Sequence, residues 1–355
     1  MNLLKCCLFI HAYVRLFTLQ RLSTKPIISM LKTSDFKAAW YLANPHLQTI
    51  WPYVFRPRRY PPYKMERLEL PDGDFVDLLW TTPGGKQPIV VLLHGLEGSY
   101  QSHYMSGLLR SLHDSGFRCV VMHFRGCSGE PNRLDRAYHS GETGDLAYLI
   151  KTVKQREPHT PVFAVGVSVG GNVLLKWLGE TGADNPLVAA AAISVPFQLN
   201  LAVARMEQGF GRVYQRYLLR SLQRNTQRKF ASRNAPFDLK RLAKIKTLRE
   251  FDDLVTAPLH GFQSAAHYYE VCSSRRYLGT IERPTLIIHA KDDPFMTPQV
   301  IPEPHELSKS TILELSERGG HVGFIANQRF KLAFTVETRI KTFFRKQLSE
   351  AGLDR

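Results

Sequence analysis

Short apolar runs alternate with amphipathic stretches along most of the chain. Five runs have the length and the apolar centre of strands buried on both faces: Ile89–Leu93, Arg118–His123, Val162–Gly166, Val188–Ser194 and Thr285–Ala290. Longer segments with helical spacing separate the first four of these, at residues 102–115, 141–157 and 170–182. This alternation of strands and helices predicts a mostly parallel, twisted sheet with helices on both faces.

The flanking regions follow other patterns. The prolines of residues 45–62 argue against a long helix, so we expect an extended arm packed on the domain. Two further strands are expected around an Asp72-Gly73 turn, at Lys64–Leu70 and Phe75–Trp80. Towards the C-terminus we expect a helix near residues 300–308, a strand at Ile312–Leu315 and a last helix over about 328–348.

The alternation is interrupted between Pro196 and Arg283. This stretch is helical in character, basic and rich in aromatic residues. A segment inserted after the strand Val188–Ser194 emerges at the carboxyl edge of the sheet, where open α/β sheets keep their sites. We therefore interpret residues 196–283 as a lid over that edge.

The motif Gly166-Val167-Ser168-Val169-Gly170 fits G-x-S-x-G and lies between an apolar strand and an apolar helix. A serine on so sharp a turn needs small neighbours, because the strand and the helix approach each other closely there. The turn directs the hydroxyl out of the sheet. Ser168 is therefore the candidate nucleophile of a serine hydrolase.

The segment His94-Gly95-Leu96-Glu97-Gly98 directly follows another predicted strand. In nucleophile-elbow enzymes the oxyanion is bound by two backbone N–H groups, one after the serine and one in this earlier loop. That pattern selects the N–H groups of Val169 and Leu96. We interpret His94 as a structural histidine that hydrogen-bonds the loop.

An acid and a base follow two later strands, in the order Ser, Asp, His that is typical of this arrangement. Gly319-Gly320-His321 supplies the base, and Lys291-Asp292-Asp293-Pro294 supplies the acid. Asp293 is favoured because it stands directly before the proline, with Asp292 as the alternative. The sequence thus predicts a triad of Ser168, Asp293 and His321.

These motifs resemble the YheT-type family of α/β-hydrolases, related to the abhydrolase-domain esterases and lipases. The resemblance covers residues from about Asn44 to the last helix. It rests also on Pro45–Thr49, Leu70–Phe75, His123–Glu130, Tyr138–Thr143, Arg249–Asp253 and His289–Phe295. It implies an α/β-hydrolase fold and a cytoplasmic enzyme that hydrolyses short-chain carboxylic esters, without a metal or another cofactor. Acyl transfer to an alcohol, lipase activity and thioesterase activity remain alternatives on the same triad.

Charge adds a second class of function. The net charge is +16, and residues 205–249 hold 13 Lys and Arg against Glu207 and Asp238. Five arginines recur every four residues on one helix face: Arg212, Arg216, Arg220, Arg224 and Arg228. The row is typical of a solvated outer face, with peripheral contact to an anionic membrane as the alternative. Binding of nucleic acid is not expected.

The N-terminus and the cysteines complete the domain assignment. Residues 1–43 are expected to be an extension, either an interfacial segment or an over-extended start before Met30, and residues 44–350 to be the hydrolase domain. The five cysteines include no C-x-x-C pair. They therefore indicate neither a disulfide framework nor a zinc site, and favour a reducing, cytoplasmic compartment.

Overall fold

The computed structural model describes residues 30–81, 85–328 and 331–353, and its centre is a sheet of nine strands. The strand order is β1-β9-β8-β7-β6-β4-β5-β3-β2. In this spatial order, neighbouring strands from β1 through β9, β8, β7, β6 and β4 to β5 pair in parallel. The pairs β5–β3 and β3–β2 are antiparallel. The strand bounds are β1 Leu31–Thr33, β2 Tyr63–Glu69, β3 Phe75–Thr81, β4 Ile89–Leu93, β5 Arg118–Met122, β6 Val162–Val167, β7 Ala189–Ile193, β8 Thr285–Ala290 and β9 Thr311–Ser316.

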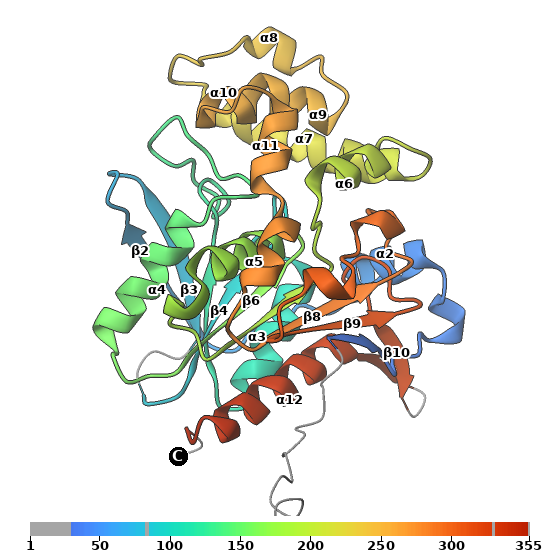
Figure 1. Ribbon diagram of the computed structural model, residues 1–355. Helices are drawn as coiled ribbons and strands as arrows, with labels where there is room; N and C mark the ends of the chain where they lie inside the picture. The colour runs from blue at the N-terminus through green and yellow to red at the C-terminus, as the bar shows by residue number, and fades with distance from the viewer. Residues whose placement is uncertain (1–29, 82–84, 329–330, 354–355) are drawn as a thin grey trace, which may run out of the picture.

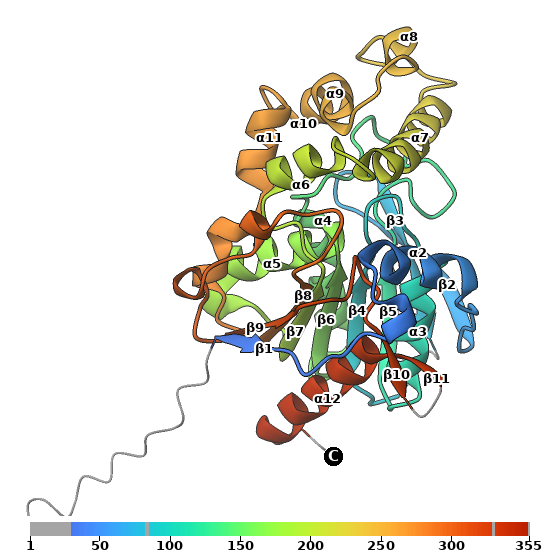
Figure 2. The same ribbon diagram turned by 90° about the vertical axis from the view of Figure 1, so that its right-hand side faces the viewer.

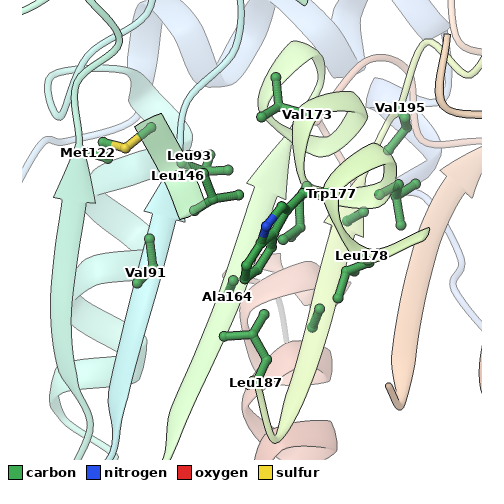
Figure 3. Packing of buried hydrophobic residues seen from close by; sticks show 14 of the residues in the cluster. Val91, Leu93, Met122, Leu146, Ala164, Val173, Trp177, Leu178, Leu187 and Val195 are labelled. Carbon is green, nitrogen blue, oxygen red and sulfur yellow. The ribbon is translucent and has the colours of Figure 1, made fainter. Parts of the chain in front are cut away.

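Helices cover both faces of this sheet (Figures 1 and 2). On one face, α4 (Gly144–Arg156) and α5 (Val169–Thr181) pack against the strands through a core that includes Trp177, Leu146 and Leu93. Figure 3 shows the Trp177 ring lying against the strand that carries Ala164. On the other face, α3 (His103–His113) and α12 (Thr335–Glu350) bury a second core. The predicted mostly parallel α/β sheet is confirmed.

Residues 199–272 form a group of helices beyond the carboxyl edge of the sheet (Figure 1, top). They have a hydrophobic cluster of their own, which contains Leu199, Leu219, Phe251 and Tyr269. We call α6 to α11 the helical cap. Its helices are α6 Leu199–Met206, α7 Gly211–Lys229, α8 Leu239–Leu242, α9 Leu248–Phe251, α10 Ala257–His260 and α11 Ala265–Cys272. A π-helical turn, Asp252–Thr256, joins α9 to α10, and the 3₁₀ turns Ser274–Thr280 lead back onto α5.

The expected extended arm is wrong, because Pro45–Phe55 forms helix α2. Pro45 stands in the first turn, where no N–H is needed, and Pro52 falls in the last turn. The Asn44 side chain caps the helix by accepting from the N–H groups of His46 and Leu47. Prolines near the two ends of a segment are thus compatible with an 11-residue helix.

Two C-terminal expectations are also wrong. The helix near residues 300–308 is replaced by two short 3₁₀ turns, Pro298–Val300 and Pro304–Glu306. Pro302 and Pro304 prevent a longer helix because each disfavours helical geometry in the residue before it. The last helix begins at Thr335, because Ile325–Gln328 (β10) and Lys331–Phe334 (β11) first form an antiparallel hairpin.

The boundary expected at residue 44 differs from the structure as well. Leu31–Thr33 pairs with Leu313–Leu315 of β9, and the turn η1 (Trp40–Leu42) packs Leu42 against Ile325. Residues 31–42 are therefore part of the domain. The alternatives for the first 29 residues lie outside the described residues.

Candidate active site

Ser168 occupies the turn between β6 and α5 with a strained backbone, at φ 53° and ψ −118°. A Cβ atom added to Gly166 would lie 2.4 Å from the carbonyl oxygen of Gly170. One added to Gly170 would lie 2.5 Å from the carbonyl oxygen of His94. The two glycines of the motif are therefore required by the close approach of strand, helix and neighbouring loop.

Three predicted site residues meet at this turn. The Nε2 atom of His321 lies 3.1 Å from Oγ of Ser168, and its Nδ1 atom lies 2.8 Å from Oδ2 of Asp293. Asp293 and His321 are both buried. They follow β8 and β9, which are neighbours in the sheet, and β7 lies between β8 and the strand β6 that leads to Ser168. A carboxylate that faces Nδ1 fixes the ring so that Nε2 is directed at the serine hydroxyl.

Asp292 has a different partner. Its Oδ1 atom accepts a hydrogen bond of 2.9 Å from the N–H group of Gly320, and burial raises the pKa of this carboxyl. Asp292 thus holds the loop that carries His321. The structure brings Asp293 to the imidazole.

Two residues that hold His321 have no predicted role in the sequence analysis. The Thr49 hydroxyl, on α2, accepts from the N–H group of His321 at 2.9 Å. The Phe295 ring stacks on the imidazole, with centroids 4.1 Å apart and planes 6° from parallel. Both residues lie in segments of the family resemblance, but nothing local in those segments shows where their side chains lie. Together they fix the histidine loop from two sides.

The loop after β4 passes close to the nucleophile. A Cβ atom on Gly95 would lie 3.3 Å from Cβ of Ser168, and the Tyr104 hydroxyl accepts from the Gly95 N–H group at 2.8 Å. Leu96, in this loop, and Val169, the first residue of α5, both line the pocket in front of Ser168. The two residues predicted for the oxyanion hole thus flank the serine.

Both ring nitrogens of His94 contact the backbone near this loop. Its Nδ1 atom lies 2.8 Å from the Gly95 carbonyl oxygen, and its Nε2 atom accepts from the Phe124 N–H group at 3.1 Å. Burial lowers the pKa of His94 to about 3, so the ring is neutral. These contacts fit a structural histidine.

A cavity of about 600 Å³ opens in front of Ser168. The sheet domain contributes the triad side and the cap contributes much of the opposite wall, including Leu199, Val203, Leu218 and Tyr269. Its volume lies within the range of about 300–1,000 Å³ that is typical of ligand sites. The arrangement can therefore hold an apolar ligand group next to the serine hydroxyl.

Two neighbouring features are structural. Arg125 forms a two-pronged ion pair with Asp145 and also contacts Asp72 and Asp74, rather than Glu130 or Glu142. These two glutamates pair with Arg67 and Arg136. Burial raises the pKa of the Cys127 thiol well above its usual value, which suppresses its nucleophilicity.

Among the described residues, no group of three or more His, Cys, Asp or Glu side chains is placed to hold a metal ion. Within the same part of the chain, no helix has the length and apolar character needed to cross a membrane.

A sequence profile described as "alpha/beta hydrolase fold" matches residues 88–328, more than half of the chain. The chain belongs to the α/β-hydrolase family. Within this family it is 49% identical to "Putative esterase YheT" of Escherichia coli (strain K12), over 84% of this chain and 89% of that protein. The resemblance to the YheT-type family is thereby confirmed.

More distant α/β-hydrolases match as well. "Phospholipase ABHD3" of Mus musculus is 31% identical over 74% of this chain and 66% of its own length. The solved structure of the Pyrococcus furiosus esterase Pf2001 superposes with a TM-score of 0.55 at 18% identity, covering 81% of this chain and 91% of that one. This last likeness shows the fold alone. The family assignment confirms the predicted enzyme class, a carboxylic ester hydrolase.

Proposed function

We propose that the chain hydrolyses carboxylic esters through an acyl-enzyme on Ser168, with His321 as the base and Asp293 as the residue that orients it. The observation that carries the proposal is the continuous contact from Ser168 Oγ to His321 Nε2 at 3.1 Å and from His321 Nδ1 to Asp293 Oδ2 at 2.8 Å. A serine hydroxyl becomes a competent nucleophile when a base within hydrogen-bond reach takes its proton.

The reaction has two halves. Ser168 Oγ bonds to the ester carbonyl carbon while its proton passes to Nε2 of His321, and the N–H groups of Leu96 and Val169 stabilise the oxyanion. The tetrahedral intermediate then collapses, the bond to the alkoxy group breaks, and the imidazolium gives its proton to the departing alcohol. Water repeats the sequence on the acyl-enzyme, releases the acid and restores the serine.

The substrate assignment combines the family with the pocket. The family resemblance favours short-chain esters, whereas a cavity of about 600 Å³ leaves room for a longer acyl chain or a larger alcohol. The cap side chains in its wall support a lid function for residues 196–283. Lipase activity is therefore the second candidate.

A panel of p-nitrophenyl esters of graded chain length separates short-chain esterase activity from lipase activity, and added alcohol tests for acyl transfer. A cytoplasmic location stays a prediction.

The nucleophile is tested with Ser168→Ala, which should abolish ester hydrolysis and labelling by a fluorophosphonate probe. Ser140→Ala is the matched control, because Ser140 lines the same pocket but stands outside the G-x-S-x-G motif. The control should retain labelling. Labelling of the Ser168 variant at the wild-type rate would contradict the assignment of Ser168 as the nucleophile.

A further inference from the structure

Helix α2 presents an unusually apolar face to solvent. Its sequence, from Pro45 to Phe55, contains no charged residue. The side chains of Leu47, Tyr53, Val54 and Phe55 are exposed, with Phe55 at 63%. Trp40, just before the helix, is 82% exposed. Single exposed apolar residues are ordinary, but several on one short segment indicate a surface that contacts something apolar.

The cap helix α7 continues this face. The hydroxyls of Tyr53 on α2 and Tyr217 on α7 lie 2.9 Å apart, and Tyr214 on α7 lies 3.0 Å from Nδ1 of His46. Val213 and Tyr217 are more than half exposed. Figure 2 shows α7 directly above α2. The two helices therefore form one surface, which we call the α2–α7 face.

The pocket opens on this face. Tyr53, Val213 and Tyr217 line the cavity and are also exposed to solvent, so they border its mouth. Arg58, which is exposed as well, lines the same side. A molecule that rests on the α2–α7 face thus has direct access to Ser168.

The two chain segments that carry the apolar patch contain basic residues and no acidic residue. No Asp or Glu occurs in the sequence from Phe36 to Met65, or from Gln208 to Phe237. The predicted arginine row is exposed along α7: Arg212, Arg216, Arg220, Arg224 and Arg228. None of the five forms an ion pair with any residue that the structure describes. Arg58 and Arg59 follow α2.

We infer that the α2–α7 face is a docking surface for an anionic lipid bilayer, which presents membrane-borne esters to the pocket. Aromatic and aliphatic side chains beside arginines are the combination that binds the boundary between headgroups and acyl chains. Arginines near an anionic leaflet add attraction that salt screens. The delivery of lipid esters rests on the proposed esterase function, whereas the docking itself does not.

Docking is tested by sedimentation of the full chain carrying Ser168→Ala with vesicles, so that turnover plays no part. Vesicles with about one third phosphatidylglycerol in phosphatidylcholine should bind the protein, and pure phosphatidylcholine should bind it far less. The triple variant Arg212→Gln, Arg216→Gln, Arg220→Gln should bind the anionic vesicles roughly 100-fold more weakly. Val54→Ser with Phe55→Ser should lose roughly tenfold or more on the same vesicles.

A matched triple variant controls for net charge. Lys151→Gln, Lys309→Gln and Lys346→Gln remove the same charge from exposed positions on α4, before β9 and on α12. These positions lie away from the α2–α7 face (Figures 1 and 2). The control should bind vesicles within about twofold of the parent chain, because attraction to the surface acts over roughly a Debye length.

Delivery is tested with Ser168 intact. The two α2–α7 variants should hydrolyse soluble p-nitrophenyl acetate at the wild-type rate, and should lose rate only on a long-chain ester carried in anionic vesicles. Equal vesicle binding by the arginine variant and the parent chain would overturn the proposal. Loss of affinity for duplex DNA in that variant, with vesicle binding intact, would overturn it in favour of nucleic acid. If the wild-type chain binds the vesicles but hydrolyses no ester, that result would instead count against the esterase function.

Discussion

The carboxylate of Glu97 accepts a hydrogen bond of 3.0 Å from the hydroxyl of Ser221, which joins the loop after β4 to the cap helix α7. Asn225, one turn further along α7, donates to the same carboxylate oxygen at 2.5 Å. Glu97 has a φ of 55°, and the Tyr138 hydroxyl accepts from its N–H group. The residue next to Leu96 thus has strained backbone geometry, with its N–H group bound by Tyr138 and its carboxylate bound by two residues of the cap.

This contact predicts that the cap influences the oxyanion loop. Glu97→Gln should lower kcat roughly 10- to 100-fold with a smaller change in KM, because a displaced N–H donor acts in the transition state. Ser221→Ala combined with Asn225→Ala should reproduce part of the loss from the cap side. The control is Gln223→Ala on the same helix α7, because the Gln223 amide donates to the backbone carbonyls of Leu242 and Ile245 and not to Glu97. An unchanged kcat in the Glu97 variant would contradict the prediction.

The two adjacent aspartates should differ in their effect on catalysis. Asp293→Asn should reduce kcat by roughly 10³- to 10⁴-fold, because the amide no longer holds His321 in the productive tautomer. Asp292→Asn should cost much less, since Asp292 binds the Gly320 N–H group and not the imidazole. Steady-state kinetics on one soluble ester compares the two directly. A larger loss in the Asp292 variant would reverse the assignment.

The cap wall of the pocket should set the preference for acyl length. Leu218 lines the cavity, so Leu218→Ala should shift the ratio of kcat/KM values toward longer p-nitrophenyl esters. Phe210, on the same segment, is 45% exposed and stands outside the cavity lining. Phe210→Ala should therefore leave the chain-length profile unchanged. Equal shifts in both variants would show that the effect comes from a looser cap.

The cap should lose stability as pH rises from about 4 to about 6. Burial raises the pKa of Asp252 to about 6, although Thr256 and Tyr269 donate hydrogen bonds to its oxygens. Because the folded state holds this proton more tightly than the unfolded chain, its contribution is full below about pH 4 and lost above about pH 6. The contribution is on the order of 1–3 kcal/mol.

The measurement for Asp252 is a difference between two proteins. Thermal unfolding of wild type and Asp252→Asn is followed from pH 4 to pH 7, and the difference in Tm is plotted against pH. The Tm of the wild type should fall relative to the Tm of the variant through this pH window, and the difference should then become constant. A flat difference would mean that Asp252 titrates normally.

The N-terminal boundary of the domain is tested by two truncations. A chain that begins at Met30 retains every strand of the nine-stranded sheet, so we expect it to fold and to hydrolyse esters. A chain that begins at Phe36 loses β1 and its pairing with Leu313–Leu315, and should unfold at a lower temperature. Equal Tm values for the two truncations would show that β1 adds nothing to the sheet.

The sequence predicted the positions of Ser168, Asp293 and His321 because each stands in a short motif at a strand end, where local pattern and topology agree. It did not reveal Thr49 or Phe295 as partners of His321. These contacts join residues far apart in the chain, and their side chains meet only once α2 and the loop after β8 are packed. The bond from Ser221 to Glu97 has the same origin.

The failed expectations have local causes. For α2, the rule that proline breaks helices was applied without regard to position, although Pro45 and Pro52 stand near the two ends. For residues 300–308, Pro302 and Pro304 disfavour helical geometry in the residues before them, and the structure has two short 3₁₀ turns there. For the hairpin β10–β11, pairing between neighbouring segments replaced a helical pattern.

Helix α2 faces the catalytic histidine on one side and solvent on the other. The side chains of Thr49 and Gln48 accept hydrogen bonds from the N–H groups of His321 and Ile325, respectively. Val54 and Phe55 are exposed to solvent. A helix with its side chains is roughly 10 Å across. The outer surface of α2 therefore lies about one helix diameter from the backbone of the general base, His321. The support of the general base and the exposed apolar surface therefore share one 11-residue helix, with Thr49 and Val54 on the same short segment.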